Sequence, residues 1–263
     1  MPLPATTTAG HQLRVAVSLV SELRGGLAAA TSIVRGSAFG TSAVSSELRP
    51  GVIPEPVILV HGLGANSSCF NKLQRWLCHA GYTVYCVNYS CLGADLADCG
   101  RRLEREAAWL RNETGCASAS VVAHSLGGVV LRSAMAHSWM RDWVRVAVTL
   151  GTPHHGTPAA RLAPSGLPGF GRIISQLRPS TDGDDSDAPD QGVGRTTRWV
   201  AVAAEHDWVV PAKYARLPGA ENVRNVTVPW GGHWTLPNSS HCLQIVLDEL
   251  AGAGPRKDDA SAA

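Results

Sequence analysis

Apolar and polar positions divide the chain into a weakly patterned first fifth and a strongly patterned remainder. From residue 56 onward, short runs of β-branched and other apolar residues alternate with longer segments whose apolar residues recur every three to four positions. Most of the short runs have no polar alternation, which is typical of strands covered by helices on both faces. The pattern predicts a three-layer α/β fold with a mainly parallel sheet and right-handed crossovers.

Six strands and four helices are expected in this region. The expected strands are 57–60, 83–89, 119–123, 144–150, 199–204 and 223–228. The expected helices are roughly 67–80, 94–114, 126–139 and 238–251. The first of these helices stops before Gly81 and the last begins after Pro237, as helix-terminus signals require.

Three segments depart from the strand–helix rhythm. Residues 1–50 are expected to form an N-terminal leader, in which 11–35 carry the apolar stripe of an amphipathic helix that packs on the protein or touches a membrane surface. Residues 156–198 are rich in Pro, Gly and Asp, and they predict a cap-like or lid-like insert within a main domain at 51–253. Residues 254–263 are expected to be a disordered tail.

Composition and charge narrow the class of protein. A chain of 263 residues with 44% hydrophobic and 17% charged residues suits one globular domain. The net charge of +2 gives no electrostatic argument for nucleic acid, and no such partner is expected. No apolar run is long enough for a transmembrane helix, and the N-terminus lacks the shape of a signal peptide, which slightly favours the cytoplasm over an extracellular location. The oligomeric state has no signature in the sequence.

Cysteine and acidic residues give no clear pattern for a cross-link or a metal site. The seven cysteines are odd in number, so at least one is unpaired within the chain. Cys86, Cys91 and Cys99 are close enough in sequence for one local disulfide, although buried thiols in a reduced compartment are the favoured interpretation. There is no C-x-x-C pair, and the acidic run at 182–187 lacks EF-hand spacing, so a solvated loop is favoured over a calcium site. Neither a metal nor a cofactor is expected.

Residues 121–128, Val-Val-Ala-His-Ser-Leu-Gly-Gly, are the most informative stretch for chemistry. Ser125 lies between an expected strand and an expected helix, with Ala123 two positions before it and Gly127 two after. This is the nucleophile-elbow pattern G-x-S-x-G with alanine in the first glycine position. Small neighbours permit a tight turn that exposes the hydroxyl, so Ser125 is predicted to be a nucleophile. A serine that caps the following helix is the alternative.

Asp207 and His233 each follow an expected strand later in the chain. A serine hydroxyl needs a general base, and the base needs an acid that orients it. Because the carboxyl ends of parallel strands gather at one edge, these side chains are expected beside Ser125, with His233 as base and Asp207 as acid. Glu205 is the rival acid, and His241 is the rival base.

The loop His61-Gly62-Leu63 follows the first expected strand directly. Glycine there lets the backbone approach a substrate, so the N–H groups of Leu63 and Leu126 are predicted to form an oxyanion hole. His61 and Gly62 are expected to line the substrate side of this loop. An ordinary strand-to-helix turn is the alternative interpretation.

Three more residues are candidates for substrate contact. His154 and His155 are neighbours, and neighbouring side chains in an extended segment point to opposite sides. No carboxylate accompanies them at the spacing of metal ligands, so a site-lining role for His154 is preferred to metal binding. Trp208 and Trp234 adjoin the predicted acid and base and offer apolar area, with core packing as the alternative. His124, which precedes the serine, is expected to have a structural role beside the elbow.

With these residues placed, the chain resembles bacterial lipases and esterases of the α/β-hydrolase superfamily and is similar to class 2 triacylglycerol lipases. The resemblance spans roughly 55–250, and Ala123 departs from the commoner glycine. It is carried by residues 57–64, 123–128 and 149–157 and by the loops of Asp207 and His233.

The resemblance implies the α/β-hydrolase fold and a serine hydrolase without a cofactor. The implied reaction is hydrolysis of carboxylic esters, of lipids or other apolar acyl groups, through a Ser-His-Asp triad and an acyl-enzyme. The implied partner is a small-molecule or lipid ester, with peripheral contact to a lipid surface. An acyltransferase, a thioesterase and a polyester depolymerase are the alternatives on the same triad, and a hydrolase-fold binding protein without turnover is the alternative outside enzymes.

Overall fold

A computed structural model of the protein describes residues 43–44, 55–162, 169–179, 192–194, 196–229 and 231–252. Within these residues a seven-stranded sheet has the order β1-β3-β2-β4-β5-β6-β7. All neighbouring pairs from β3 to β7 are parallel, and β1 is antiparallel to β3. The strands are β1 (Ala43–Val44), β2 (Val57–Val60), β3 (Val84–Val87), β4 (Ala119–His124), β5 (Val144–Leu150), β6 (Arg198–Ala204) and β7 (Val223–Val228).

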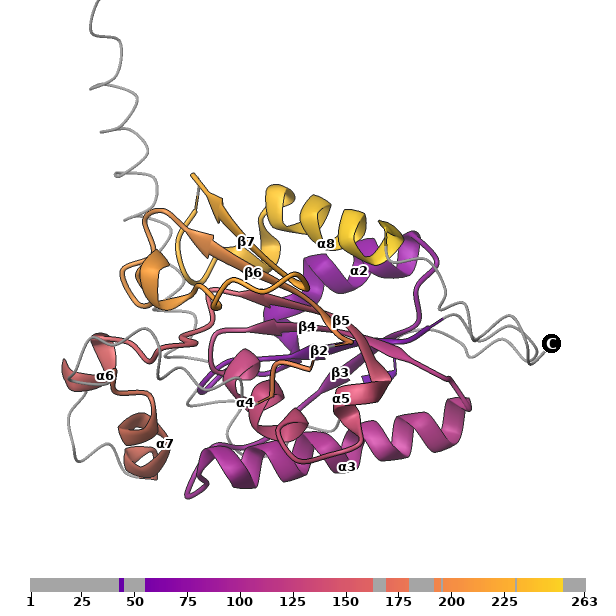
Figure 1. The fold of residues 1–263 in the computed structure, drawn as a ribbon, viewed down its shortest axis with the longest axis horizontal. Coiled ribbons are helices and arrows are strands. Elements are labelled where there is room, and N and C mark those ends of the chain that lie inside the picture. The colour runs from indigo at the N-terminus through magenta and orange to yellow at the C-terminus, as the bar shows by residue number, and fades with distance from the viewer. Residues whose placement is uncertain are drawn as a thin grey trace, which may run out of the picture.

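Helices cover both faces of the sheet, as Figure 1 shows, with α2 and α8 on one face and α3, α4 and α5 on the other. The helices are α2 (Asn71–His79), α3 (Leu96–Thr114), α4 (Leu126–Met135), α5 (Met140–Trp143), α6 (Ala159–Leu162), α7 (Gly171–Gln176) and α8 (Ser240–Gly252). Short 3₁₀ turns span Ser67–Phe70, Ala212–Tyr214 and Leu236–Asn238. The predicted three-layer α/β fold is confirmed.

The two faces of the sheet have separate apolar cores, which explains the unbroken apolar runs in the strands. In β2, Ile58 and Val60 pack toward α3 and α4, whereas Val57 and Leu59 pack toward α2 and α8. All four residues are fully buried. Successive residues of a strand face opposite sides, so a strand between two cores must be apolar at every position.

Strand β1 was not predicted from the sequence, and it lies in the segment expected to be a leader. It has two residues, which pair Ala43 with Cys86 and Val44 with Tyr85. So short a strand depends on the edge of β3 rather than on a pattern of its own. One expected helix, 126–139, is shorter than predicted: α4 ends at Met135, and the short helix α5 begins beyond the expected range, at Met140.

Several sequence expectations fall wholly or partly outside the described residues. These are the helix at 11–35, the tail at 254–263, the acidic run at 182–187 and much of the insert at 156–198. Helices α6 and α7 are the described helical parts of that insert. Among the described residues, no helix is both long and apolar enough to span a membrane. The seven cysteines are present as free thiols.

Candidate active site

Ser125 occupies the sharp turn between β4 and α4. Its φ of 54° and ψ of −126° make it the one non-glycine residue with positive φ in the described part of the chain. Such a conformation is strained and persists only where its surroundings fix it. The Ser125 N–H donates to the Leu150 carbonyl at 2.9 Å, and a Cβ on Gly127 would lie 2.3 Å from the Val60 carbonyl oxygen. Glycine at 127 therefore lets α4 pack closely on the end of β2, which helps to hold the turn.

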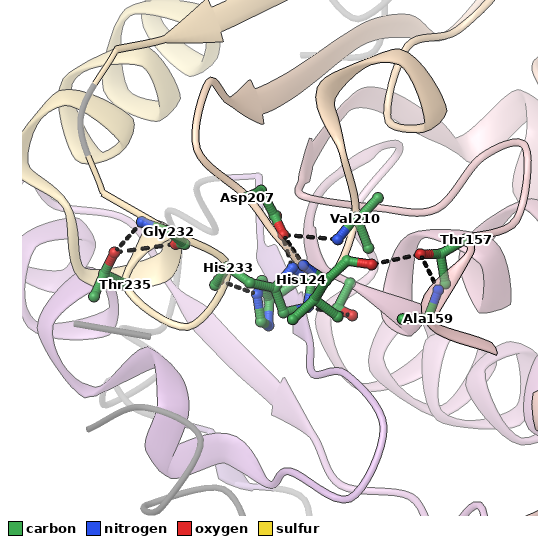
Figure 2. Close-up of polar contacts among 10 residues, drawn as sticks. His124, Thr157, Ala159, Asp207, Val210, Gly232, His233 and Thr235 are labelled. Carbon is green, nitrogen blue, oxygen red and sulfur yellow. Dashed lines mark hydrogen bonds and ion pairs between the residues drawn. The ribbon is translucent and has the colours of Figure 1, made fainter. Parts of the chain in front are cut away.

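Ser125, His233 and Asp207 form a continuous hydrogen-bonded chain. His233 Nε2 lies 2.9 Å from Ser125 Oγ, and His233 Nδ1 lies 2.8 Å from Asp207 Oδ2. His233 and Asp207 are 1% and 4% exposed, and Figure 2 shows them facing each other from separate loops. A carboxylate only accepts, so Nδ1 carries the proton and Nε2 offers its lone pair to the serine hydroxyl. The loops after β4, β6 and β7 thus bring together the three residues predicted from sequence.

The second carboxylate oxygen of Asp207 is held by the backbone of its own loop. Oδ1 accepts hydrogen bonds from the N–H groups of Val209 at 2.9 Å and Val210 at 2.7 Å. With Oδ2 bonded to His233, both oxygens are fixed, and so is the orientation of the carboxylate. The rivals considered from sequence, Glu205 and His241, have exposed side chains.

The start of the insert is tied to this acid loop through Thr157. The buried Thr157 hydroxyl donates to the Val209 carbonyl and accepts from the Ala159 N–H at 3.3 Å, as Figure 2 shows. Val209 in turn donates its N–H to Asp207. Val209 therefore links Thr157, at the start of the insert, to the Asp207 carboxylate.

Gly151 lies against the Asp207–His233 pair and was not singled out from the sequence. It follows β5 and has a φ of 56°. A Cβ there would lie 3.1 Å from Asp207 Oδ2, 3.2 Å from His233 Nδ1 and 2.9 Å from Leu236 Cδ1. Its place at a strand end, like that of the predicted residues, was the signal that could have found it.

The predicted oxyanion loop runs directly beside the serine. A Cβ on Gly62 would lie 2.9 Å from Ser125 Cβ and 3.4 Å from Ser125 Oγ. Leu63 follows this glycine, and Leu126 is the first residue of α4. The N–H groups in the first turn of a helix have no carbonyl partner within that helix. The two backbone segments predicted to donate to an oxyanion therefore flank the serine.

His61 supports this loop from within the protein. Its ring is buried and stacks on Tyr89 at a centroid distance of 4.5 Å. Nδ1 donates to the Gly62 carbonyl at 2.9 Å, and Nε2 accepts from the Tyr89 N–H at 3.3 Å. The Tyr89 hydroxyl also donates to the His61 carbonyl at 2.7 Å. Both ring nitrogens are therefore engaged inside the loop, and Tyr89 is a supporting residue that the sequence did not suggest.

The other candidates for substrate contact, Trp234, Trp208 and His154, differ in burial and in their contact with the Ser-His-Asp chain. Trp234 lies edge-on to His233, with ring centroids 5.2 Å apart. Trp208 is 63% exposed, next to Asp207 in sequence. The His154 ring is buried, with Nε2 3.0 Å from the Thr149 hydroxyl oxygen. Of these three, Trp234 is the one whose side chain the structure places against the Ser-His-Asp chain.

The sequence is similar to a known protein family. The sequence profile of the Alpha/beta hydrolase family matches residues 57–253. The chain belongs to the alpha/beta hydrolase family. It is 30% identical over 216 residues to a triacylglycerol lipase of Pseudarthrobacter phenanthrenivorans and likewise to one of Burkholderia plantarii. Each match covers 70% of this chain, which spans 66% and 59% of the length of those two lipases.

Solved structures agree with this fold assignment. The mature Bacillus licheniformis lipase BlEst2 matches with a TM-score of 0.67 at 22% identity, covering 80% of this chain and 98% of that one. Aspergillus fumigatus lipase B matches with a TM-score of 0.65 at 14% identity, covering 83% of this chain and 57% of that one. At these identities the likeness establishes the alpha/beta hydrolase fold alone.

In this alpha/beta hydrolase, the apolar residues in and directly after α7 lie in the core. Ile173, Ile174 and Leu177 are buried in the same cluster as residues of α3 and α4. Leu162, in contrast, is 86% exposed on α6. Among the described residues, no group of three or more histidine, cysteine or acidic side chains is arranged to hold a metal ion.

Three buried histidines are expected to make this alpha/beta hydrolase labile to acid. Burial lowers the pKa of His61 to about 4 and, with repulsion from His233, that of His124 to about 3; burial and nearby Arg132 bring the pKa of His154 well below its ordinary value. In the unfolded chain these rings titrate near pH 6.5, so below that pH the unfolded state binds more protons than the folded state. The free energy of unfolding should therefore fall as the pH drops from 6.5 toward 4.

Urea unfolding at pH 7, 6 and 5 measures this effect. Three protons taken up only on unfolding give a slope approaching about 4 kcal/mol per pH unit from these rings. A free energy of unfolding that stays constant from pH 7 to pH 5 would contradict the assignment of three neutral buried rings.

Proposed function

We propose that this alpha/beta hydrolase is a serine hydrolase that cleaves carboxylic esters, with Ser125 as nucleophile, His233 as general base and Asp207 as the orienting acid. The observation that carries the proposal is the hydrogen-bonded chain from Ser125 Oγ through His233 to Asp207. In that chain the base already faces the hydroxyl with its unprotonated nitrogen, as nucleophilic catalysis by serine requires.

In the acylation step, Ser125 Oγ attacks the carbonyl carbon of the ester while its proton moves to His233 Nε2. The C=O double bond becomes a C–O⁻ single bond, and the negative oxygen accepts hydrogen bonds from the Leu63 and Leu126 N–H groups. One such donor typically contributes roughly 2.7–4 kcal/mol to stabilising the transition state. Asp207 keeps its bond to Nδ1–H and stabilises the imidazolium that forms.

Collapse of this intermediate breaks the bond between the acyl carbon and the alcohol oxygen. His233 gives its proton to the leaving alcohol, and the acyl group stays on Ser125. A water molecule then attacks the acyl carbon and loses a proton to His233. The second intermediate releases the carboxylic acid, and His233 returns the proton to Ser125 Oγ.

The proposed substrates are lipid or other apolar acyl esters. The support is the name of the two relatives, both triacylglycerol lipases, together with apolar side chains close in sequence to the site. Trp208 follows the acid, Trp234 packs on the base, and Gly62 borders the serine, so we assign these three to the walls of the substrate site. His61 acts on that site through the loop that it holds, and the buried His154 ring bonds to Thr149 at the end of β5.

Acyl transfer, thioester hydrolysis and polyester depolymerisation would use the same three side chains. They differ from ester hydrolysis in the leaving group or in the acceptor of the acyl group, so product analysis separates them. Contact with a lipid surface follows from the lipid substrate class and is part of the proposal rather than an independent finding.

Purified protein is expected to hydrolyse p-nitrophenyl butyrate and p-nitrophenyl palmitate and to react with one equivalent of a fluorophosphonate probe. The exposed Trp208 and Leu162 lead us to expect activity on the long chain as well as on the short one. The measurements are p-nitrophenol release and mass spectrometry of the labelled peptide. Protein labelled beforehand serves as the control. Absence of both turnover and labelling at Ser125 would reject the proposal.

A further inference from the structure

His124, the residue before the serine, makes a hydrogen bond to the backbone of the residue that carries the base. Its Nε2 lies 2.9 Å from the carbonyl oxygen of His233. A carbonyl oxygen only accepts, so Nε2 carries the proton and donates it. The bond joins the end of β4 to the loop after β7, two segments that are 109 positions apart in sequence.

The other ring nitrogen of His124 has no partner among the described residues, and this is costly for a buried group. The side chain is 2% exposed, and Nδ1 is a buried atom without a hydrogen-bond partner. Leaving a buried polar atom unsatisfied typically costs about 1–3 kcal/mol, which an apolar ring of similar size would avoid. The histidine is therefore a poor choice for packing alone, and its one bond to His233 distinguishes it from a phenylalanine.

The residue before the base is bonded within its own loop. Gly231, whose φ is 88°, and Gly232 directly precede His233. Gly232 bonds to the nearby Thr235 hydroxyl through both its N–H and its carbonyl, so that contact is internal to the loop. The bond from His124 instead ties the loop to the strand that carries the serine. Figure 2 shows His124 and His233 adjacent, with Gly232 and Thr235 on the other side of the loop.

Three contacts therefore restrain His233 from different directions. Asp207 holds Nδ1, Trp234 packs edge-on to the ring, and His124 holds the carbonyl. The His124 ring itself lies 4.9 Å from the His233 ring, centroid to centroid. Desolvation keeps His124 neutral, since burial lowers its pKa to about 3, and it thus adds no charge beside the imidazolium that forms during the reaction.

We propose that His124 is a positioning residue for the general base, which fixes the backbone of His233 so that Nε2 stays within hydrogen-bond reach of Ser125 Oγ. This inference rests on the proposed function, because positioning matters only if His233 is the base. A loss of about 1 Å in placement can cost about 100-fold in rate, so one backbone bond is sufficient to affect turnover.

Two pairs of variants test the role of the donor. In the first, His124→Phe keeps a ring without a donor, and His124→Gln places an amide N–H near the position of Nε2. We expect His124→Phe to lower kcat by about 10- to 100-fold with KM changed less than about 3-fold, and His124→Gln to restore kcat to within about 5-fold of wild type. In the second, His124→Asn carries the same amide on a shorter side chain that does not reach the carbonyl, and it should be as slow as the Phe variant. The Gln–Asn pair decides the matter if the Phe variant does not fold.

The control for lost stability is Leu250→Ala, which removes a buried side chain from α8 on the α2–α8 side of the sheet. It should lower the free energy of unfolding while kcat per fluorophosphonate-titrated site stays at the wild-type value. A His124→Phe variant with wild-type kcat per titrated site, or a Gln variant no faster than Asn, would overturn the inference. A wild-type protein without ester hydrolysis or labelling would instead reject the proposed function, and so the two failures are distinguishable.

Discussion

Replacing Ser125 with alanine is expected to lower kcat for ester hydrolysis by at least about 10⁴-fold and to abolish labelling by a fluorophosphonate. The variant loses the only atom that bonds to the acyl carbon, whereas the oxyanion donors and the substrate walls remain. Alanine has the same backbone preferences as serine at a φ of 54°, so the strain of the turn is unchanged. The free energy of unfolding should therefore stay close to that of wild type.

Ser133→Ala is the matched control for this substitution. Ser133 is also on α4, where its hydroxyl donates to the Leu96 carbonyl at 3.2 Å. Its removal should cost about 0.5–1.5 kcal/mol of stability and leave kcat within about 2-fold. A folded Ser125→Ala protein that still hydrolyses p-nitrophenyl esters would show that another residue is the nucleophile.

Replacing Asp207 with asparagine is expected to lower kcat by about 10⁴-fold without unfolding the protein. The asparagine carbonyl can still accept from the N–H groups of Val209 and Val210, which leaves its NH₂ group facing His233 Nδ1. Nδ1 must then become the acceptor, and the ring proton moves to Nε2. An Nε2 that carries a proton cannot accept another from Ser125, so the base is in the wrong tautomer.

Asp248→Asn is the control for the loss of one carboxylate. Asp248 lies on α8, outside the acid loop, and accepts a hydrogen bond from the exposed Gln244 at 2.8 Å. Its substitution should leave kcat unchanged. The decisive measurement is kcat per folded molecule, with folding followed by circular dichroism. Retention of more than about a tenth of the activity by Asp207→Asn would transfer the role of acid to another carboxylate, with Glu205 the first to examine.

The fold could be predicted from sequence wherever burial left a continuous apolar run. Val57–Val60 and Val144–Leu150 have the bounds that the pattern predicts. The pattern is readable because each strand lies in a sheet covered by helices, so its burial is nearly independent of which strand is its neighbour. Strand β1 could not be predicted, since two residues have no periodicity and pair only because the edge of β3 is there.

Some residues of the candidate site could be predicted from the sequence and others could not. The proximity of Ser125, Asp207 and His233 could be predicted because each lies in a loop after a strand, and parallel topology brings strand ends together. Tyr89 could not be predicted, because what makes it important is a contact with a loop distant in sequence, whereas Gly151 directly follows a strand and could have been found by its position. For His61, the sequence placed the loop correctly, but the direction of its ring depends on stacking with Tyr89, which no local pattern encodes.

The bond from Thr157 to Val209 limits how far the insert can be treated as an exchangeable module. Engineers commonly graft such segments between relatives to alter substrate preference. Here the Thr157 hydroxyl also holds the carbonyl of the Val209–Val210 peptide, whose N–H bonds to Asp207. A graft that replaces Thr157 would remove a support of the acid, and any change in rate would then include that loss. A junction placed after Thr157 would keep this bond to the acid loop.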